Sequence, residues 1–392
     1  MDLHDETDFW SHLIDEIVIA QPAYYGRENW DAERFGAYKR TIAESLAVLF
    51  NRYVRSDISL LSFDPSTSFD PGIPSNKQYN LIRSSLPGCA KTYTLLADDY
   101  SRTLFIRLIA FRILGFHKVK LPLAINSIDL EKKRDSVRSL MNVAVTEKKT
   151  IGNQTLHLMD LRPIGYPVHC YATENVILTT FILKQYEYRH GDTTISVSPG
   201  DVVIDAGGCW GDTALFFSCA AGNQGRVFSF EFDPENLAVF TQNMALNTGL
   251  SERISITPLA VWENSNERFQ YSANGLSTTI APGYEQRPVE KEMQVATISI
   301  DDFVQQNNLE RLDFIKMDIE AAELNALKGA ADTIRQFRPI LAIAQYHKTS
   351  DFADIPHCIG ELTENYSYFI DHFSIHHEET VLFAIPDEKL RR

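Results

Sequence analysis

The stretch Asp201-Val-Val-Ile-Asp-Ala-Gly-Gly-Cys-Trp-Gly211 decides the fold that this sequence predicts. Residues 202–205 are a short apolar run, which is typical of a parallel strand covered on both faces. The glycines Gly207, Gly208 and Gly211 let the backbone turn sharply and approach a ligand closely. A helix is expected from Gly211 onward. Strand, glycine loop and helix in this order indicate an open α/β sheet that holds a ligand at the loop.

Beyond residue 200 the chain alternates short apolar runs with helical patterns. This alternation predicts parallel βαβ units with helices on both faces of one sheet. The end of the chain differs, because two apolar runs flank a polar turn and predict an antiparallel final pair. The expected strands are 202–205, 227–231, 254–259, 314–318, 340–345, 366–371 and 380–385, and the expected helices begin near residues 211, 234, 301, 321 and 351.

The N-terminal part has a mainly helical pattern. Apolar residues recur at helical spacing in 9–17 and 35–53, which predicts helices that pack internally. A further helix is expected over 101–114, with Asp98 or Asp99 as N-cap and Gly115 at its end.

Two other segments connect these regions. Residues 62–90 are rich in Ser, Pro, Asn and Gly, which predicts a loop or linker. The domains expected from these changes in pattern are a mainly helical N-terminal domain (1–150), a lead-in segment packed on the next domain (151–199) and an α/β domain (200–392).

The composition excludes several classes of protein. A formal net charge of −15 over 392 residues argues against a nucleic-acid partner, because phosphate binding needs clustered Lys and Arg. The five cysteines are widely spread without a CxxC pair, so reduced thiols in a cytoplasmic protein are expected. The acidic N-terminus lacks a signal core, and the most apolar run, 104–116, is too short to cross a bilayer, so no membrane insertion is expected.

Glu231 lies at the end of the second expected strand, 24 positions after Gly207. An acid about 20 residues beyond a glycine loop can accept hydrogen bonds from both ribose hydroxyls of a nucleoside. The alternative is that Glu231 only caps the helix that starts at Pro234.

Asp205 directly precedes the glycines, in the spacing Asp205-x-Gly207-x-x-x-Gly211. Nicotinamide cofactors normally require G-x-G-x-x-G. An acid at this position suits a ligand with a positive amino group and would repel a pyrophosphate. This charge argument favours S-adenosylmethionine over a dinucleotide.

The fourth expected strand carries Lys316, Asp318 and Glu320 toward its carboxyl end. A carboxylate there could orient an acceptor or take its proton. Alternatively, Asp318 and Glu320 cap the next helix and pair with Lys316. His347 follows the fifth strand and is a candidate general base, although a single loop histidine is often only part of the surface. Together with Glu323 these groups offer ligands for a divalent cation, but their spacing is not specific and no metal site is predicted.

Several ordered blocks resemble the FkbM family of S-adenosylmethionine-dependent methyltransferases over residues 175–386. The blocks are Gly200–Gly211, Val227–Pro234, Thr297–Asp302, Asp313–Glu320, Leu327–Ala330 and Thr380–Ala384. This resemblance implies a class I methyltransferase (Rossmann-like) fold, α/β with a seven-stranded sheet whose last strand is antiparallel.

The resemblance also implies roles for individual residues. Asp205, Gly207, Gly208 and Gly211 would lie near the methionine part of the cofactor. Glu231 would hold the ribose, and Phe232 would flank the adenine. Lys316, Asp318 and Glu320 match the Lys-x-Asp-x-Glu-Gly block of the family. The chain departs from the family where Gly208 and Cys209 replace Ala and Asn and where Ala321 replaces Gly.

The expected function is S-adenosylmethionine-dependent O-methylation of a hydroxyl on a small metabolite, sugar or natural product. The alternatives are a nicotinamide-dependent oxidoreductase and a non-catalytic binding protein that retains the fold. The insertion at about 262–296 is the expected acceptor lid within the α/β domain, and the N-terminal helices and lead-in would help to choose the acceptor. A small-molecule acceptor is the expected partner, and a homo-oligomer is left open.

Overall fold

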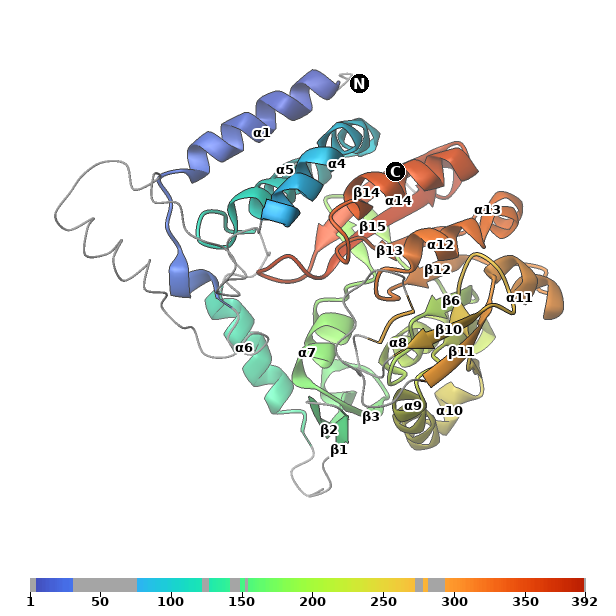
Figure 1. Cartoon of the computed structure of the whole chain (residues 1–392). Coiled ribbons are helices and arrows are strands. Elements are labelled where there is room, and N and C mark those ends of the chain that lie inside the picture. Colours follow the sequence, from blue (N-terminus) through green and yellow to red (C-terminus); the bar gives the residue numbers. More distant parts are fainter. Residues whose placement is uncertain are drawn as a thin grey trace.

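A computed structural model describes residues 5–30, 76–121, 127–141, 149–151, 154–271, 278–280 and 293–390 (Figure 1). The helix expected over 35–53 lies outside these ranges. Among the described helices, none is both long and apolar enough to cross a membrane.

The centre of the molecule is a seven-stranded sheet in the order β14-β15-β13-β12-β6-β7-β8. β15 runs antiparallel to both of its neighbours, and the other pairs are parallel. The expected strands and the antiparallel final pair are therefore confirmed. The strands are β6 (Val202–Ala206), β7 (Arg226–Phe230), β8 (Ile254–Thr257), β12 (Phe314–Met317), β13 (Ile340–Ala344), β14 (Tyr366–His372) and β15 (Thr380–Pro386).

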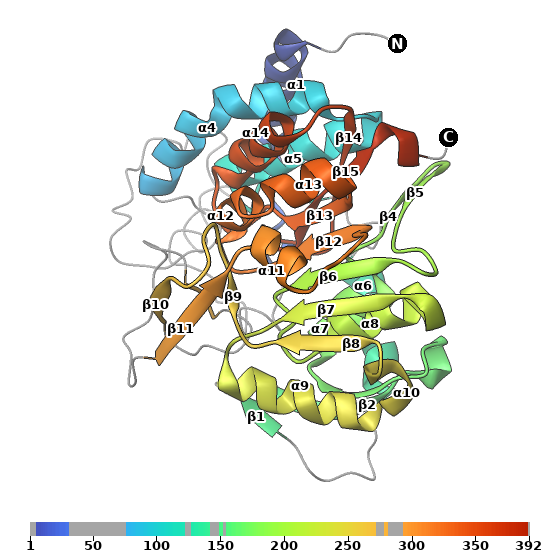
Figure 2. The same ribbon diagram turned by 90° about the vertical axis from the view of Figure 1, so that its right-hand side faces the viewer.

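Helices cover both faces of this sheet. The buried residues of its strands accordingly alternate between two apolar clusters. Ile204 and Ile343 belong to one cluster, and Val203 and Ala342 to the other. Figure 2 shows α11–α13 and α8 on opposite sides of the strands. The helices of this region are α8 (Asp212–Ala221), α9 (Pro234–Leu246), α10 (Thr248–Ser251), α11 (Ile300–Gln306), α12 (Glu323–Lys328), α13 (Ala331–Phe337) and α14 (Asp351–Leu362), with 3-10 turns η4 (Gly222–Gln224) and η6 (Asp387–Lys389).

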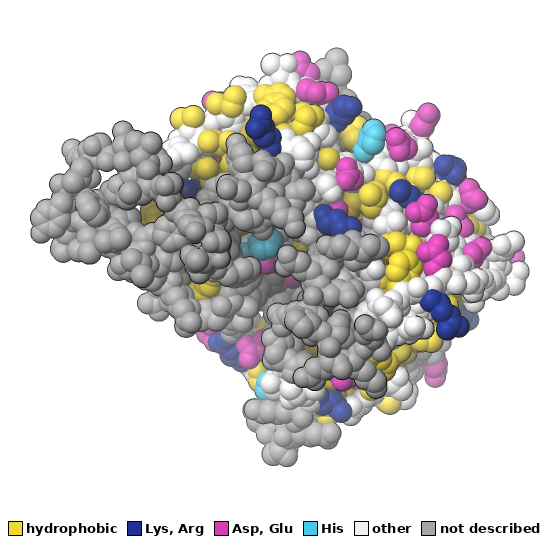
Figure 3. Space-filling model, in the orientation of Figure 1, with side chains coloured by type: hydrophobic (Ala, Val, Ile, Leu, Met, Phe, Trp, Pro, Cys, Tyr) yellow, Lys and Arg dark blue, Asp and Glu magenta, His cyan; other side chains and the backbone are white. Residues whose placement is uncertain are grey.

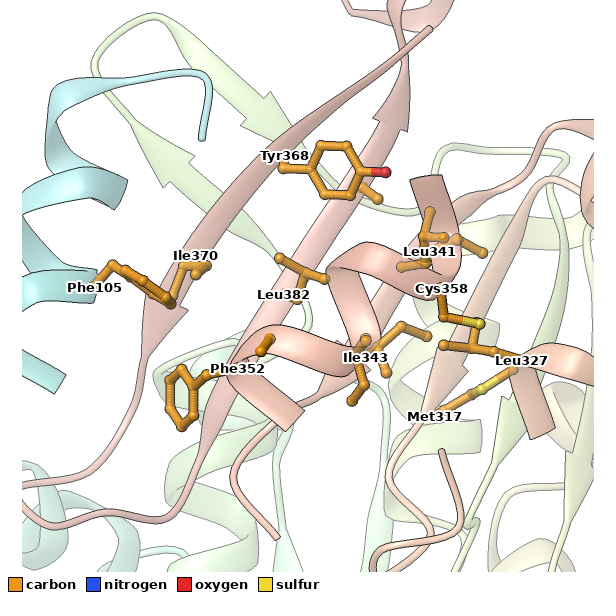
Figure 4. Packing of buried hydrophobic residues seen from close by; sticks show 14 of the residues in the cluster. Phe105, Met317, Leu327, Leu341, Ile343, Phe352, Cys358, Tyr368, Ile370 and Leu382 are labelled. Carbon is orange, nitrogen blue, oxygen red and sulfur yellow. The ribbon is translucent and has the colours of Figure 1, made fainter. Parts of the chain in front are cut away.

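The N-terminal helices share one of these clusters with the sheet rather than forming a separate core. Figure 4 shows Phe105 of α5 against Ile370 of β14. α5 has Asp98 as N-cap and ends at Gly115, as expected. The elements are α1 (Glu6–Ala20), η1 (Gly26–Asn29), α4 (Asn76–Leu95) and α5 (Asp99–Leu114).

The linker expected over 62–90 is wrong from residue 76 onward, because α4 begins there and contains both Pro87 and Gly88. Gly88 allows close packing between helices, since a Cβ at this position would lie 2.6 Å from the Cβ of Ala353 in α14. The Thr92 hydroxyl also donates to the Phe352 carbonyl, 2.9 Å away. The glycine that suggested a break is instead what lets the two helices approach.

The outward side of α1 carries apolar side chains, including Ile14 at 58% and Val18 at 62% exposure. Figure 3 shows hydrophobic side chains gathered over this part of the surface. The inward side carries Phe9 and Leu13, which are buried.

The lead-in segment contacts α9 through hydrogen bonds to its backbone. Asn243 and Asn247 of α9 bind the backbones of Tyr171 and His169, respectively. Its elements and the preceding helix are α6 (Ser127–Arg138), β1 (Lys149–Ile151), β2 (Gln154–Asp160), η2 (Arg162–Ile164), β3 (His169–Ala172), α7 (Glu174–Ile177), the π-helical turn η3 (Leu178–Ile182), β4 (Tyr188–His190) and β5 (Thr193–Ile195).

The region around 262–296 contributes a small separate sheet in the order β10-β11-β9. In Figure 2 the arrowheads of β6, β7 and β8 point toward this sheet. Its strands are β9 (Ala260–Val261), β10 (Arg268–Tyr271) and β11 (Met293–Ile298).

Candidate functional site

A cleft opens where the parallel strands end. The loops after β6, β7, β8 and β12 line it, and Thr278 and Ile280 line it from the 262–296 region. The loop residues include Gly207, Glu231 and Asp318. Ligands of open α/β sheets bind at this edge, so the cleft is the candidate site.

The glycine loop is packed tightly against the loop after β12. Gly207 has φ +86°, and a Cβ there would lie 1.9 Å from the Asp318 carbonyl oxygen. The N–H groups of Gly207 and Gly208 both donate to the Phe230 carbonyl, at 3.0 and 2.8 Å. Glycine is therefore required at position 207 by both its backbone conformation and its neighbour. Gly211 follows as the N-cap of α8, outside the cleft lining.

Asp205 and Lys316 form a buried ion pair beneath the glycine loop, with Nζ 3.2 Å from Oδ1. Thr213 and Ser229 donate hydroxyl hydrogen bonds to the Asp205 carboxylate. Lys316 Nζ also donates to the carbonyls of Ala206 and Gly207, at 3.1 and 2.6 Å. Burial alone would lower the Lys316 pKa, but Asp205 and other nearby carboxylates outweigh it and raise this pKa. Neither side chain lines the cleft.

This placement changes the interpretation of both residues. The charge of Asp205 is balanced inside the protein, so it is not available to a ligand in the cleft. Lys316 supports two carbonyls of the glycine loop, which is a positioning role.

Glu231 lies in the cleft lining and is 7% exposed. One carboxylate oxygen accepts from the N–H groups of Phe232 (2.6 Å) and Asp233 (2.7 Å), and the other accepts from Asn236 (3.3 Å). Burial raises the Glu231 pKa to about 7, although the backbone donors oppose this shift. Asp233, not Glu231, caps α9. The alternative of a simple helix cap at Glu231 is therefore wrong.

Phe232 forms an apolar wall of the same cleft. Its ring contacts Tyr271 edge to face, with centroids 4.9 Å apart. Ile280 and Leu259 also line this part of the cleft, which makes it a suitable surface for a flat base.

Asp318 follows β12 and also faces the cleft. The Tyr186 hydroxyl donates to its Oδ2 at 2.8 Å, and the Tyr346 hydroxyl lies 3.2 Å from Oδ1. Burial, reinforced by Asp318, raises the pKa of both tyrosines well above 10, so both remain neutral donors. These two tyrosines fix the orientation of the carboxylate. Neither tyrosine was predicted from the sequence, although Tyr346 directly precedes His347.

His347 is buried among carboxylates, with a side chain only 2% exposed. Its Nε2 lies 3.4 Å from Asp318 and 3.6 Å from Glu320, and its Nδ1 lies 3.1 Å from Glu323. Burial alone would lower the His347 pKa, but Glu323 and Glu320 outweigh it and raise this pKa well above 6.5. The alternative of an ordinary surface histidine is therefore wrong. Asp318 and Glu320 face His347, and Lys316 pairs with Asp205 instead.

His376 lies in the polar turn between β14 and β15 but is buried. It is 1% exposed and packs against Trp30 and Phe116.

The loop between Asp318 and α12 is strained, since Glu320 and Ala321 have φ values of +54° and +75°. Lys348 Nζ donates to the Ala321 carbonyl at 2.6 Å, and Thr279 donates to the Glu320 carbonyl. Cys209 in the glycine loop also has a positive φ, +42°. Such strain persists only where surrounding contacts hold it, and it is common at functional sites.

We expect Ala321→Gly to raise the free energy of unfolding by about 0.5–1 kcal/mol, because glycine adopts positive φ without steric cost. Denaturant unfolding measures this change. Ala326→Gly is the matched control, since Ala326 lies buried inside α12 and this change should destabilise by about 1 kcal/mol or more. Equal destabilisation of both variants would contradict strain at Ala321.

Comparisons with known proteins agree with this architecture. Residues 197–378 match the model of the methyltransferase FkbM domain. A curated relative, hexuronic acid methyltransferase AglP of Haloferax volcanii, is 26% identical over 165 residues, which are 41% of this chain and 62% of the relative. The match thus spans about three fifths of that relative's length.

Two solved structures are also similar. The FkbM methyltransferase of Methylobacillus flagellatus KT has 20% identity and a TM-score of 0.48, with 77% of this chain and 59% of that chain covered. Fibrillarin of Aeropyrum pernix has 11% identity and a TM-score of 0.32, with 62% and 100% covered. Residues 197–378 of this chain therefore carry a methyltransferase FkbM domain.

Proposed function

We propose that this protein transfers a methyl group from S-adenosylmethionine to a hydroxyl oxygen of a small metabolite, sugar or natural product. One observation carries the proposal. A single cleft is lined by Glu231 on one side and by Asp318 and Glu320 on the other. The first side suits a nucleoside, and the second offers carboxylates for proton removal.

The residues of the cleft fit the cofactor at its nucleoside end. The Glu231 carboxylate can accept from ribose hydroxyls, and Phe232 and Ile280 provide apolar surface for the adenine. Gly207 also lines the cleft and lies close to the backbone of Asp318. The balanced charge of Asp205 removes one argument for the cofactor, so the proposal rests on Glu231 and on the family.

S-adenosylmethionine, when bound, supplies an electrophilic methyl group on a positively charged sulfur. The protein must align the acceptor and remove its proton. The hydroxyl oxygen gains the methyl group and loses its proton, for which Asp318 is the proposed acceptor. Tyr186 and Tyr346 hold the Asp318 carboxylate in place, and Glu320 and His347 complete the polar wall beside it.

The charges near Asp318 bear on the choice of acceptor group. Asp318, Glu320 and Glu323 gather three carboxylates around a single histidine. These carboxylates disfavour methylation of a group that is itself a carboxylate, whereas a hydroxyl would find a proton acceptor there. The name of the curated relative, a hexuronic acid methyltransferase, makes sugar acids and their neutral counterparts suitable first acceptors to test.

Calorimetry with S-adenosylhomocysteine tests the proposal directly. The wild-type protein should bind one equivalent, whereas NAD(H) should not bind in a parallel thermal-shift measurement. Absence of S-adenosylhomocysteine binding would sink the proposal, and NAD(H) binding in its place would favour the oxidoreductase alternative.

Asp318→Asn separates catalysis from cofactor binding. We expect methyl transfer to fall by about 10²–10⁴-fold, the usual contribution of a general base, while S-adenosylhomocysteine affinity stays within about threefold. Turnover of S-adenosylmethionine with a panel of sugars and sugar acids measures the first effect. Equal losses of turnover and affinity would place Asp318 in cofactor binding, and wild-type failure on a broad acceptor panel would favour the non-catalytic alternative.

The organisation of the chain supports two subsidiary proposals. The lead-in segment contributes Tyr186 to the acceptor side, so we assign acceptor choice to it together with the 262–296 region. All five cysteines are unpaired thiols, which fits the proposed cytoplasmic location.

A further inference from the structure

Three side chains at the acceptor end of the cleft offer ligand atoms that converge on one point. The carboxylate oxygens of Asp318 and Glu320 and a ring nitrogen of His347 all lie within 4.8 Å of one another. They come from the ends of two adjacent parallel strands, β12 and β13. We propose that this triad binds a divalent cation of the Mn²⁺ or Mg²⁺ class, and this inference rests on the proposed function for its role at the acceptor.

The buried histidine is the observation that points to a ligand. Neither ring nitrogen of His347 makes a hydrogen bond of ordinary geometry, although the side chain is only 2% exposed. Its Nε2 lies 3.4 and 3.6 Å from the two carboxylates, which is longer than ordinary hydrogen bonds of about 2.7–3.2 Å. Two ligands about 2.1 Å from one octahedral ion lie about 3 Å apart, so small side-chain movements would bring all three atoms into range.

Glu323 prepares His347 to act as a ligand. Its Oε1 lies 3.1 Å from Nδ1 and also accepts from the N–H of Ile319 at 2.8 Å. A carboxylate on the far nitrogen favours the tautomer that leaves Nε2 free to coordinate, and it holds the ring in place. Glu323 is itself 1% exposed, so this arrangement is fixed by the interior.

The two carboxylates are also held by the protein. Tyr186 and Tyr346 contact Asp318, as described above. Glu320 sits on the strained loop, which Lys348 and Thr279 fasten through the carbonyls of Ala321 and Glu320. Carboxylates of like charge held close together repel one another, and a divalent ion between them would offset that repulsion.

The ligand set selects the class of ion. Two carboxylates and one imidazole, with no thiolate among the three, suit hard or intermediate ions such as Mn²⁺. Three protein ligands leave positions for oxygen atoms of the acceptor. A cation there would orient an acceptor hydroxyl and lower its pKa before methyl transfer.

Mn²⁺ titration of chelator-treated full-length protein, followed by electron paramagnetic resonance, tests the site without any need for turnover. We expect one bound Mn²⁺ per chain, with competition by Mg²⁺. Asp318→Asn and Glu320→Gln should each weaken Mn²⁺ binding at least tenfold, and Glu323→Gln should weaken it by about 10–100-fold. Glu231→Gln is the matched control in the same cleft and should leave Mn²⁺ binding unchanged.

The outcomes separate this inference from the proposed function. Normal S-adenosylhomocysteine binding without saturable Mn²⁺ binding below about 1 mM would overturn the cation site alone, leaving a cluster bridged by a proton on His347. Mn²⁺ binding that is weakened by none of Asp318→Asn, Glu320→Gln and Glu323→Gln would overturn it as well. Mn²⁺ binding that the variants weaken, in a protein that binds no S-adenosylhomocysteine, would support the site and overturn the proposed function. Circular dichroism shows whether each variant folds. If Asp318→Asn does not fold, Glu320→Gln provides the test in its place.

Discussion

Glu231→Gln should weaken S-adenosylhomocysteine binding by about 10²–10⁴-fold, because the two proposed charge-assisted hydrogen bonds to the ribose are each worth about 1.5–3 kcal/mol. The change keeps the size of the side chain, and its remaining oxygen can still accept from the N–H groups of Phe232 and Asp233. Calorimetry measures the loss. Glu235→Gln is the control, since this exposed acid lies in the first turn of the adjacent helix α9. Unchanged affinity in Glu231→Gln would remove Glu231 from the cofactor site.

The pH dependence of stability in the wild type and in Glu231→Gln provides a second, independent test of Glu231. The folded pKa of Glu231 is raised to about 7, from an ordinary value of 4.5. Its contribution to stability is therefore present below pH 4.5 and is lost as the pH rises through about 7, with a total change of ~3 kcal/mol. Above pH 7, Glu231→Gln should be more stable than the wild type in the absence of ligand.

Ligand affinity should show the opposite trend with pH. The ionised carboxylate is the better hydrogen-bond acceptor, so wild-type affinity should fall by up to about tenfold per unit below pH 7. Glu231→Gln should show no such dependence. A wild-type binding curve that is flat between pH 5.5 and 8 would contradict the assignment.

Lys316→Met should lower the free energy of unfolding by about 3–5 kcal/mol, which is the largest loss of stability expected from a single change here. The substitution leaves the Asp205 carboxylate charged and buried without its cation, and it removes the donor to the carbonyls of Ala206 and Gly207. Denaturant unfolding measures the loss. Lys328→Met, at an exposed position of α12, should stay within about 0.5 kcal/mol of the wild type.

The double variant Asp205→Asn with Lys316→Met distinguishes a charge effect from a packing effect. It should recover a large part of the lost stability, because no unpaired buried charge remains. If the loss of stability in the double variant equalled the sum of the losses in Asp205→Asn and Lys316→Met, the ion pair itself would contribute little.

The sheet could be predicted from sequence because its signals are local. Each parallel strand is an apolar run bounded by turn residues, and burial on both faces makes that pattern continuous. The first part of α4 could not be predicted, because the residues that explain its sequence lie far away in the chain. Gly88 breaks the local helical pattern, and only its contact with Ala353 in a distant helix explains it.

The candidate site was predicted in part. Glu231, Phe232, Asp318 and Glu320 all line one cleft, as their positions at the ends of strands imply. The surroundings of each charge could not be read from sequence. Asp205 and Lys316 are 111 positions apart along the chain and pair only when β6 and β12 lie side by side. Tyr186 reaches Asp318 across 132 positions, with no nearby motif to mark it.

The contact between Tyr186 and Asp318 has a consequence for how this protein can diversify. Tyr186 precedes residue 197, where the match to the FkbM domain model begins, whereas Asp318 lies within that match. The contact between Tyr186 and Asp318 therefore joins a residue outside the matched domain to one inside it. A change in the segment before residue 197 would alter this neighbour of Asp318 and leave the residues of the matched domain in place.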